Sequence, residues 1–316
     1  MKLTVRLLAL LGWAIVFWNV ENYFEDSPHF SDKTRAIAKV ALALADSTGE
    51  PPDIVGLCEV ENAACLRRLV AQPALRKHGY RFVHYDSPDH RGIDCALLYR
   101  SPSRVGSLRG SRSIPIRDSL GVVLPTRSLL LVEFDSVAVI VCHLPSKRGG
   151  SVEADRRRSL ALAALSCVCD SLAHLDSGEF YPYFLAETAN FDQSGENWGV
   201  NLAADRKIIV MGDFNDIRTA ASDSVMAPMR ELPPEDDGPP GTIKFQGRWE
   251  QIDRAFVSAD SIGVTLHIAA PPFLLEPDKK FGGVKPRRTF IGPRYNGGLS
   301  DHLPIMITLP SSRHRK

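Results

Sequence analysis

The sequence lacks a strong net charge. Its 316 residues contain 38 Lys and Arg against 37 Asp and Glu, which leaves a formal charge of +1 at pH 7. Dedicated DNA-binding proteins commonly carry a broad basic field over one face. The composition therefore excludes a global basic field, and nucleic acid could bind only through a local patch.

Cysteine spacings typical of metal sites are also missing. None of the six cysteines forms a CxxC pair or a Cys/His ligand pattern. Cys58, Cys95 and Cys142 each lie in an apolar run. Cys167 and Cys169 share a helix-like stretch, where an offset of two positions points them to different faces. We predict that these thiols are small core residues, which favours a reducing compartment.

A membrane-spanning segment is absent too. The apolar run from Leu7 to Trp18 follows a basic start and is shorter than the roughly 20 residues that a bilayer helix needs. Two interpretations stay open for residues 1–13, because no A-x-A cleavage site is visible. They form a secretory signal, which implies an exported or periplasmic protein, or they precede the first core strand of a cytoplasmic one.

Strand-like and helix-like segments alternate along the chain, without repeats or linkers, so we predict a single α/β domain over residues 14–316. Predicted strands lie at 14–20, 51–60, 80–86, 93–100, 128–134, 137–144, 207–214, 242–247, 252–258 and 303–309. Predicted helices lie at 31–47 with Ser31 as N-cap, at 63–72 and at 153–175. A polar insertion from about Ser177 to Asp205 has no assigned structure or role.

Polar residues recur where the predicted strands begin or end. They are Asn19, Glu59, His143, Asp213, Asn215, Asp253, Asp301 and His302. A polar strand end is often only the place where the chain leaves the core, and that interpretation is open for each residue taken alone. The whole set, however, consists of Asn, Asp, Glu and His without any Lys. Because ligands of α/β proteins gather at strand ends, we expect these residues to converge on one cleft.

The chemistry of the set fits a hard cation. Asn19, Glu59 and Asp301 offer oxygen donors, which suit Mg²⁺. A histidine beside a metal carboxylate, with a separate Asp holding its other ring nitrogen, forms a general base with an orienting partner. This combination fits attack of water on phosphorus.

Seven motifs carry a resemblance to a known family. In chain order they are FWNVEN, DIVGLCEVEN, GIDCALLYR, VIVCHLPSKRGG, IIVMGDFND, QIDRAFVS and GGLSDHLPIMI. Together they resemble the endonuclease/exonuclease/phosphatase superfamily of deoxyribonuclease I-like nucleases, abasic-site exonucleases, neutral sphingomyelinases and inositol polyphosphate 5-phosphatases. The resemblance extends from about Ala14 to Leu309. It implies a four-layer α/β sandwich, with two mixed β-sheets face to face and helices outside.

The resemblance also implies roles for individual residues. Glu59 resembles the family's principal metal ligand, which Asn19 and Asp301 would assist directly or through water. His302 is similar to the histidine that acts on the nucleophilic water or on the transferred phosphate. Asp253 is similar to the carboxylate that orients this histidine.

Four further positions complete the catalytic candidates. Asp213 and Asn215 resemble the pair that positions water and contacts the phosphate, and Asp213 could serve as the base instead of the histidine. His143 falls where some members place a second histidine and others a tyrosine. Asp94 could orient His143, or it could be a structural Asp at the start of a strand.

We therefore expect a monomeric, Mg²⁺-dependent phosphoesterase, with Mn²⁺ as a substitute, that uses in-line attack of water. A nuclease is the first expectation, although no dense Lys/Arg cluster or DNA-inserting loop is evident. Lys147 and Arg148 could contact substrate phosphates or lie in a solvated loop. The alternatives are a phosphatase or phosphodiesterase acting on inositol phosphates, sphingolipids or another small phosphoester, and an inactive binding protein on the same fold.

Overall fold

The computed structural model describes residues 13–45, 49–146, 152–174, 206–217, 226 and 229–310. Residues 1–12, Lys147, Arg148 and the insertion at 177–205 lie outside these ranges. The interpretations offered for these segments therefore stay predictions.

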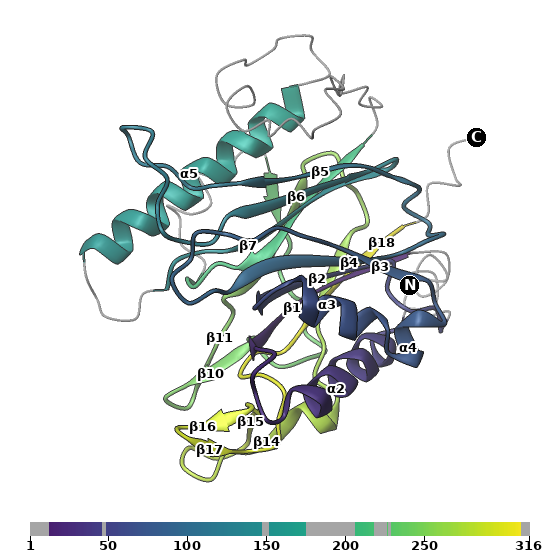
Figure 1. The fold of residues 1–316 in the computed structure, drawn as a ribbon, viewed down its shortest axis with the longest axis vertical. Coiled ribbons are helices and arrows are strands. Elements are labelled where there is room, and N and C mark those ends of the chain that lie inside the picture. Colours follow the sequence, from purple (N-terminus) through teal and green to yellow (C-terminus); the bar gives the residue numbers. More distant parts are fainter. Residues whose placement is uncertain are drawn as a thin grey trace.

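A six-stranded sheet is built around the first strands of the chain, in the order β13-β18-β1-β2-β4-β3 (Figure 1). Its strands are β1 (Trp13–Tyr23), β2 (Ile54–Val60), β3 (Tyr80–His84), β4 (Asp94–Arg100), β13 (Thr265–Ile268) and β18 (Ile305–Leu309). β1 and β2 are parallel and the other neighbours are antiparallel, so this first sheet is mixed. β1 is buried along almost its whole length, as expected for a strand covered on both faces.

A second six-stranded sheet has the order β5-β6-β7-β8-β12-β9. Its strands are β5 (Leu108–Ile114), β6 (Leu129–Phe134), β7 (Val137–His143), β8 (Lys207–Asp213), β9 (Met229–Glu231) and β12 (Asp253–Ser258). β6 and β7 form an antiparallel hairpin, and β7 and β8 are parallel. This sheet is mixed as well.

Helices cover the outer faces of the two sheets. α2 (Phe30–Ala43), α3 (Ala63–Val70) and α4 (Pro73–Arg76) lie below the first sheet in Figure 1, and α5 (Val152–His174) lies above the second. The inner faces approach closely at Gly56 on β2, where a Cβ atom would lie 2.6 Å from Met211 Cε and 3.2 Å from Val141 Cγ2. The predicted four-layer α/β sandwich is confirmed.

Helix α2 begins one residue earlier than predicted. Its N-cap is His29, which makes no side-chain capping bond, and Ser31 lies inside the first turn. The ring of Phe30 is buried and stacks on Tyr23 with centroids 5.1 Å apart, so packing rather than a polar cap sets this helix start. The prediction of Ser31 as N-cap was wrong.

The apolar patterns missed the short and polar strands. β5 has the sequence LRGSRSI, which carries no regular alternation, and it forms because β6 offers a paired edge. The predicted strand at 242–247 contains β10 (Ile243–Phe245), but its partner β11 (Arg248–Glu250) was missed. Two further small hairpins were missed as well: β14 (Leu275–Pro277) with β15 (Val284–Pro286), and β16 (Phe290–Ile291) with β17 (Arg294–Tyr295). We call residues 272–298 the hairpin lobe; it lies at the bottom of Figure 1.

Four of the five thiols named above follow the prediction: Cys58, Cys95, Cys142 and Cys169 are free and buried. Cys167 is free and exposed, so the prediction of a core position was wrong for this residue. Among the described residues, no helix has both the length and the apolar character needed to cross a membrane.

Candidate active site

Three neighbouring strands of the second sheet present polar residues at one level. His143 at the end of β7 pairs in register with Asp213 at the end of β8, and Asp213 pairs with Asp253 at the start of β12. All three residues are buried. His143 Nε2 lies 3.6 Å from Asp213 Oδ2. Regular strand pairing therefore brings together residues that are far apart in the sequence.

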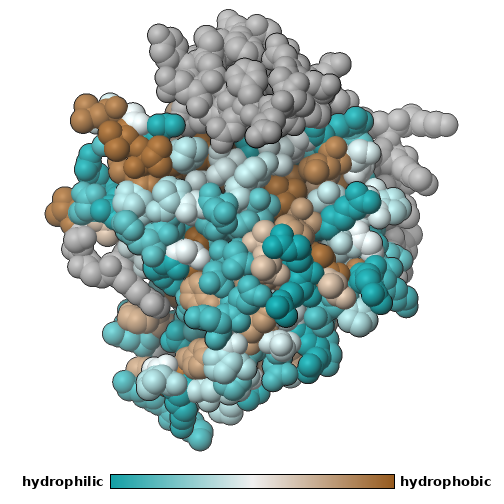
Figure 2. All heavy atoms as spheres, viewed as in Figure 1, coloured by the Kyte–Doolittle hydropathy of each residue, from teal (hydrophilic) through white to brown (hydrophobic). Residues whose placement is uncertain are grey.

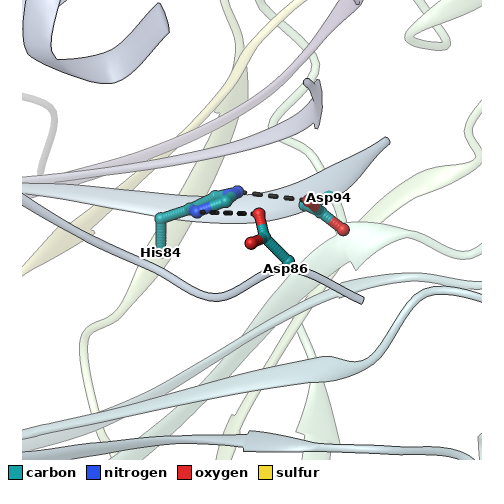
Figure 3. Close-up of side chains that lie close together, drawn as sticks. All are labelled: His84, Asp86 and Asp94. Carbon is teal, nitrogen blue, oxygen red and sulfur yellow. Dashed lines mark hydrogen bonds and ion pairs between the residues drawn. The ribbon is translucent and has the colours of Figure 1, made fainter. Parts of the chain in front are cut away.

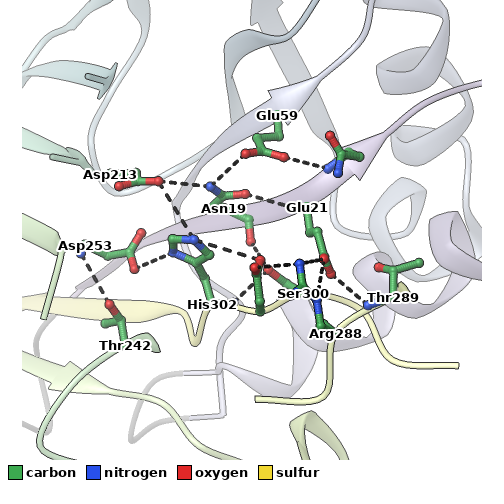
Figure 4. Close-up of polar contacts among 12 residues, drawn as sticks. Asn19, Glu21, Glu59, Asp213, Thr242, Asp253, Arg288, Thr289, Ser300 and His302 are labelled. Atoms are coloured by element: carbon green, nitrogen blue, oxygen red, sulfur yellow. Dashed lines mark hydrogen bonds and ion pairs between the residues drawn. The ribbon is translucent and has the colours of Figure 1, made fainter. Parts of the chain in front are cut away.

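His302 joins this row from the loop before β18. Its Nδ1 donates to Asp253 Oδ2 at 2.8 Å, so the predicted contact is present (Figure 4). Its Nε2 lies 3.9 Å from Asp213 Oδ2 and 3.9 Å from Asp301 Oδ1. Burial alone lowers the pKa of His302, but the charges of Asp253, Asp213 and Asp301 outweigh burial and hold this pKa well above its ordinary value. The imidazole is therefore a cation among carboxylates.

The end of β1 fixes the position of the His302 loop. Ser300 Oγ donates to the carbonyl of Asn19 at 2.6 Å and accepts the backbone N–H of His302 at 3.0 Å. Trp18 Nε1 donates to the carbonyl of His302 at 2.9 Å. The first and last core strands are thus joined at the site.

In the first sheet, the strands lose their regular register at the site. The β1–β2 pairing shifts after Asn19, and the β2–β4 pairing shifts after Cys58. Glu59 has a φ of 62°, in the left-handed region that few side-chain-bearing residues adopt. Bulges of this kind redirect side chains. Asn19 Nδ2 donates to Glu59 Oε1 at 3.4 Å and to Asp213 Oδ2 at 3.1 Å, and so joins the two sheets.

Asn215 lies two residues after the end of β8 and has a φ of 50°. Its backbone N–H donates to Asp213 Oδ1 at 2.9 Å, and its side-chain Nδ2 donates to the carbonyl of Leu144 at 2.9 Å. Contacts of 3.9 Å or less therefore link the residues that we expected to meet: Asn19, Glu59, Asp213, Asn215, Asp253, Asp301 and His302.

A buried acid that sequence reasoning missed, Glu21, anchors the other side of this cluster. Arg288 donates to Glu21 Oε1 at 2.8 and 3.0 Å, and the backbone N–H of Thr289 donates to Glu21 Oε2 at 2.7 Å (Figure 4). Arg288 Nη2 also lies 3.0 Å from Asp301 Oδ2. Lys33 Nζ donates to Thr289 Oγ1 at 2.7 Å. The one sequence signal was an acid two positions after Asn19, at the end of a strand.

Of the two interpretations left open for Asp94, the pairing with His143 was wrong and the structural one fits. Asp94 Oδ2 lies 3.2 Å from His84 Nε2 (Figure 3). Asp94 Oδ1 accepts the backbone N–H of Ser87 at 3.0 Å. β3 and β4 are antiparallel, so the start of β4 lies beside the end of β3, and His84 is the histidine within reach. Asp94 thus holds the β3–β4 connection.

His143 keeps no orienting carboxylate. Its Nδ1 is buried and has no hydrogen-bond partner within the described part of the chain. Burial, together with the positive charges of Arg127, His302 and Arg91, holds the pKa of His143 well below its ordinary value. The His143 ring is therefore neutral, in contrast to His302.

The order of motifs and this geometry agree with a family comparison. The model of the Endonuclease/Exonuclease/phosphatase family matches residues 14–179 and 199–311. The chain belongs to this family. Members of the endonuclease/exonuclease/phosphatase family are hydrolases that act on phosphoester bonds. The comparison with curated proteins finds no match.

Three solved structures are examples of proteins with the same fold. The human nocturnin catalytic domain with bound sulfate is 18% identical with a TM-score of 0.55, over 94% of this chain and 93% of that one. Sphingomyelinase C from Streptomyces griseocarneus is 14% identical with a TM-score of 0.57, over 94% and 99%. A mannosyl-6-phosphatase from Bacteroides thetaiotaomicron is 15% identical with a TM-score of 0.54, over 93% and 98%. At these identities the likeness shows the fold alone.

The endonuclease/exonuclease/phosphatase family is metal-dependent, and the donors of this chain fit a divalent cation. The side chains of Glu59 and Asp301 are 12% and 27% exposed and offer oxygen atoms only. Burial raises the pKa of Asp213 to about 7, and the charge of Asp253 adds to this rise. Negative charge at the cluster is therefore in excess, and a divalent cation would relieve it.

Asn19 does not present its oxygen to such a cation in this structure. Asn19 Oδ1 accepts the backbone N–H of Glu21 at 3.0 Å, while Nδ2 faces the two carboxylates. Direct ligation by Asn19 would require its amide to turn over. As the structure stands, Asn19 is a donor that spaces Glu59 from Asp213.

Proposed function

We propose that this protein is a Mg²⁺-dependent nuclease that hydrolyses phosphodiester bonds by in-line attack of water. One observation carries the proposal: Glu59, Asp213 and the His302–Asp253 pair meet in a single polar cluster at the ends of both sheets. Carboxylates for a hard cation, beside an oriented histidine, are the groups that hydrolysis of a phosphoester requires.

Glu59 and Asp301 would hold the ion, and Asn19 would assist by orienting Glu59 or by turning its oxygen to the ion. A bound divalent ion supplies neutralisation of the charge that develops on the phosphate. An all-oxygen donor set favours Mg²⁺ or Mn²⁺ over Zn²⁺. We assign the ion to Glu59 rather than to the group formed by Asp213, Asp253 and His302, because the imidazolium offsets part of the negative charge of that group and Asp253 Oδ2 is bound to His302 Nδ1.

The remaining groups act on the water and the phosphate. Asp213 orients the water and accepts its proton while the water oxygen bonds to phosphorus and the bond to the leaving oxygen breaks. His302, held by Asp253, donates from Nε2 to a phosphoryl oxygen. His143 contacts a second phosphoryl oxygen, and Asn215 holds Asp213 through its backbone N–H.

The hairpin lobe supports a polyanionic substrate. Its residues 272–298 contain six Lys and Arg against two Asp and Glu, in a chain whose total charge is only +1. Phe281 and Tyr295 on the lobe are 50% and 39% exposed. Cations interleaved with exposed aromatic rings are typical of surfaces that bind single-stranded nucleic acid. On the face shown in Figure 2, hydrophilic residues predominate at the bottom of the molecule, where Figure 1 places the lobe.

The lobe is also continuous with the candidate site. Arg288 and Thr289 belong to the lobe and bind Glu21 directly, and Arg288 contacts Asp301. A nucleic acid strand that lies on the lobe would therefore lead into the cluster. The six Lys and Arg of the hairpin lobe, residues 272–298, were not recognised as a basic group in the sequence.

The test is a screen for metal-dependent hydrolysis. Single-stranded and duplex oligonucleotides, plasmid DNA, bis-p-nitrophenyl phosphate, inositol phosphates and sphingomyelin would be incubated with the protein in Mg²⁺, Mn²⁺ or EDTA. We expect cleavage of nucleic acid in Mg²⁺ and none in EDTA or with His302→Ala. Hydrolysis of small phosphomonoesters alone would show that the protein is a phosphatase and not a nuclease. No turnover of any substrate would favour an inactive binding protein.

A further inference from the structure

Arg91 has no part in the proposed chemistry, yet its guanidinium borders the proposed metal ligand. It lies in the connection between β3 and β4. Arg91 Nη2 donates to Asn22 Oδ1 at 3.0 Å and lies 3.7 Å from Glu59 Oε2. The side chain is 54% exposed. Within the described residues, no protein acceptor contacts its Nε or Nη1, so these donors are available to a ligand.

The turn that carries Arg91 is braced by a buried ion pair. Asp89 Oδ2 accepts the backbone N–H of Arg91 at 3.0 Å, and Asp89 O accepts that of Gly92 at 3.0 Å. Asp89 Oδ1 is bound at 3.1 Å by Nη1 of Arg127, and these side chains are only 6% and 9% exposed. Asp89 therefore has two structural roles: it closes the turn through backbone hydrogen bonds, and it attaches the turn to Arg127.

Arg127 ties this turn to the opposite sheet. Its Nε donates to the carbonyl of His143 at 3.2 Å, and its Nη2 donates to that of Leu144 at 2.9 Å. At the base of the same connection, Asp94 contacts His84 (Figure 3) and accepts the backbone N–H of Ser87. An exposed loop with no task does not need a buried arginine to fix it, because burying a charge costs free energy unless it is fully paired. The bracing fixes the turn that places the exposed side chain of Arg91 beside Glu59.

We propose that Arg91 binds a phosphoryl oxygen of the substrate on the Glu59 side of the site, and that Asp89 and Arg127 are positioning residues for it. The inference rests on the proposed phosphoester chemistry and adds a substrate-binding residue to it. A guanidinium offers paired N–H donors that match two phosphate oxygens, and it stays charged at any working pH. Asn22, a neutral acceptor, orients the Arg91 side chain without consuming its charge.

A rival explanation is that Arg91 only neutralises Glu59. The two roles predict different affinities for phosphate and Mg²⁺, and these affinities can be measured without following substrate turnover. If Arg91 binds phosphate, Arg91→Ala weakens the affinity for inorganic phosphate in the presence of Mg²⁺ by about 10- to 100-fold, the usual value of a hydrogen bond to a charged group. Arg91→Lys recovers part of this loss, because lysine keeps the charge and loses the paired donors. If Arg91 only neutralises Glu59, Arg91→Ala tightens Mg²⁺ binding and leaves phosphate affinity unchanged.

The experiment is calorimetric titration of the full chain with Mg²⁺ alone and then with inorganic phosphate in saturating Mg²⁺. The matched control is Arg109→Ala, an arginine whose side chain is 62% exposed and paired with Asp135, remote from the cluster. It should leave both affinities unchanged. Arg127→Met keeps Arg91 but removes its support, so this variant should weaken phosphate binding as Arg91→Ala does. If a thermal melt shows that Arg127→Met is unfolded, Asp89→Asn is used as the positioning variant instead.

The outcomes separate this inference from the proposed function. Phosphate binding that depends on Arg91, in a protein that cleaves no nucleic acid, would reject the nuclease and keep the anion site. An active nuclease whose Arg91→Ala variant keeps its phosphate affinity would reject the role of Arg91 alone. A wild-type protein that binds no phosphate in Mg²⁺ would also overturn the inference.

Discussion

The candidate site joins two regions that are built in different ways. The second-sheet side, with His143, Asp213 and Asp253, consists of three strands in regular register, and its side chains are almost fully buried. The first-sheet side, with Asn19 and Glu59, consists of strand ends whose register shifts. Regular pairing gives the first group a fixed geometry, whereas irregular pairing lets Glu59 reach solvent.

Backbone strain is distributed in the same way. Among the described residues, five other than glycine have a positive φ, namely Glu21, Asn22, Glu59, Asn215 and Gln246. Three of them lie at the irregular ends of β1 and β2, and a fourth follows Asp213. Such conformations cost free energy and persist where the surroundings enforce them, often at functional sites. The difference suggests that the second-sheet side orients reacting groups, while the first-sheet side presents ligands to an ion.

The largest effect expected from this division is that of Glu59→Gln. The variant keeps the shape of the side chain and removes one charge from the ion, so the rate should fall about 10³-fold, as when a major electrostatic group of a site is lost. The wild-type protein should melt at a higher temperature in Mg²⁺, because ligand binding stabilises the folded state, and the variant should lose this shift. Turnover and thermal melts against Mg²⁺ concentration measure both.

Asp32→Asn, an exposed helix-surface acid paired with Arg35, is the control for loss of one charge and should behave as the wild type. An active Glu59→Gln variant with the wild-type Mg²⁺ curve would remove Glu59 from its proposed role. The division between the two regions would then have no functional meaning.

Asp253→Asn should have a smaller effect of a different kind. Asparagine can still accept the hydrogen bond from His302 Nδ1 at 2.8 Å, but it no longer supports the charge of the imidazolium. We expect the rate to fall about 10²-fold, which is typical for one acid–base element of a site, with no change in the Mg²⁺ dependence. An Asp253→Asn protein whose main defect is weakened Mg²⁺ binding would show that the two regions do not divide their tasks.

The regular side was also the more predictable one. Continuous apolar runs placed His143, Asp213 and Asp253 at strand ends, and strand register alone then brought them to one level. The contact of His302 with Asp253 followed only from the family resemblance. Polar strand ends say nothing of the loops between them, so the Asp94–His143 pair was wrong and the brace around Arg127 was not foreseen.

The irregular side was largely hidden from pattern reasoning. Glu21 takes its role from a bulge and from Arg288, which lies far along the chain in a lobe of short hairpins. Neither bulges nor two-residue strands leave a periodic signal. The aromatic and basic character of the hairpin lobe is visible in the sequence, but only folding gathers it beside Asp301.

Both regions contain a buried thiol next to a site residue, and these thiols make the free energy of unfolding depend on pH. Burial raises the pKa of Cys58, beside Glu59, and of Cys142, beside His143, well above the ordinary value, and it raises the pKa of Cys95 to about 12. The unfolded thiols lose their protons near pH 9 while the folded ones keep them, so the unfolded state binds fewer protons above that pH. The contribution of these thiols to the free energy of unfolding is therefore present below about pH 9. It is lost between about pH 9 and pH 12, by about 1.4 kcal/mol per pH unit for each thiol.

Urea unfolding at pH 8, 9 and 10 measures this loss. Cys142→Ala should reduce the slope of stability against pH above pH 9 by the share of one thiol, at some cost in stability at pH 8. A wild-type protein whose unfolding free energy stays constant from pH 8 to pH 10 would contradict the burial of these thiols.

The smallest effect concerns the one strained residue that lies outside the site. Gln246 has a φ of 47° and, with Gly247 at 83°, forms the two-residue loop between Phe245 of β10 and Arg248 of β11. Both central residues of such a loop need a positive φ, which Asn tolerates better than Gln. Gln246→Asn should therefore raise the free energy of unfolding by about 0.5–1 kcal/mol, seen as an increase in urea midpoint without loss of activity. The strain at Gln246 is dispensable, whereas at Glu59 any relief by replacement would also remove the ligand.

A matched variant in the same loop tests this reasoning from the other side. Gly247→Ala should be destabilising, because the added Cβ would lie 2.8 Å from Phe281 Cγ and the backbone has a positive φ. If Gln246→Asn raises and Gly247→Ala lowers the free energy of unfolding, local backbone conformation, and not a general tolerance of this hairpin to substitution, determines these effects. If Gln246→Asn instead lowered turnover of oligonucleotides while leaving bis-p-nitrophenyl phosphate unaffected, the β10–β11 hairpin would belong to the substrate surface. Strain in this protein would then mark function at all five positions.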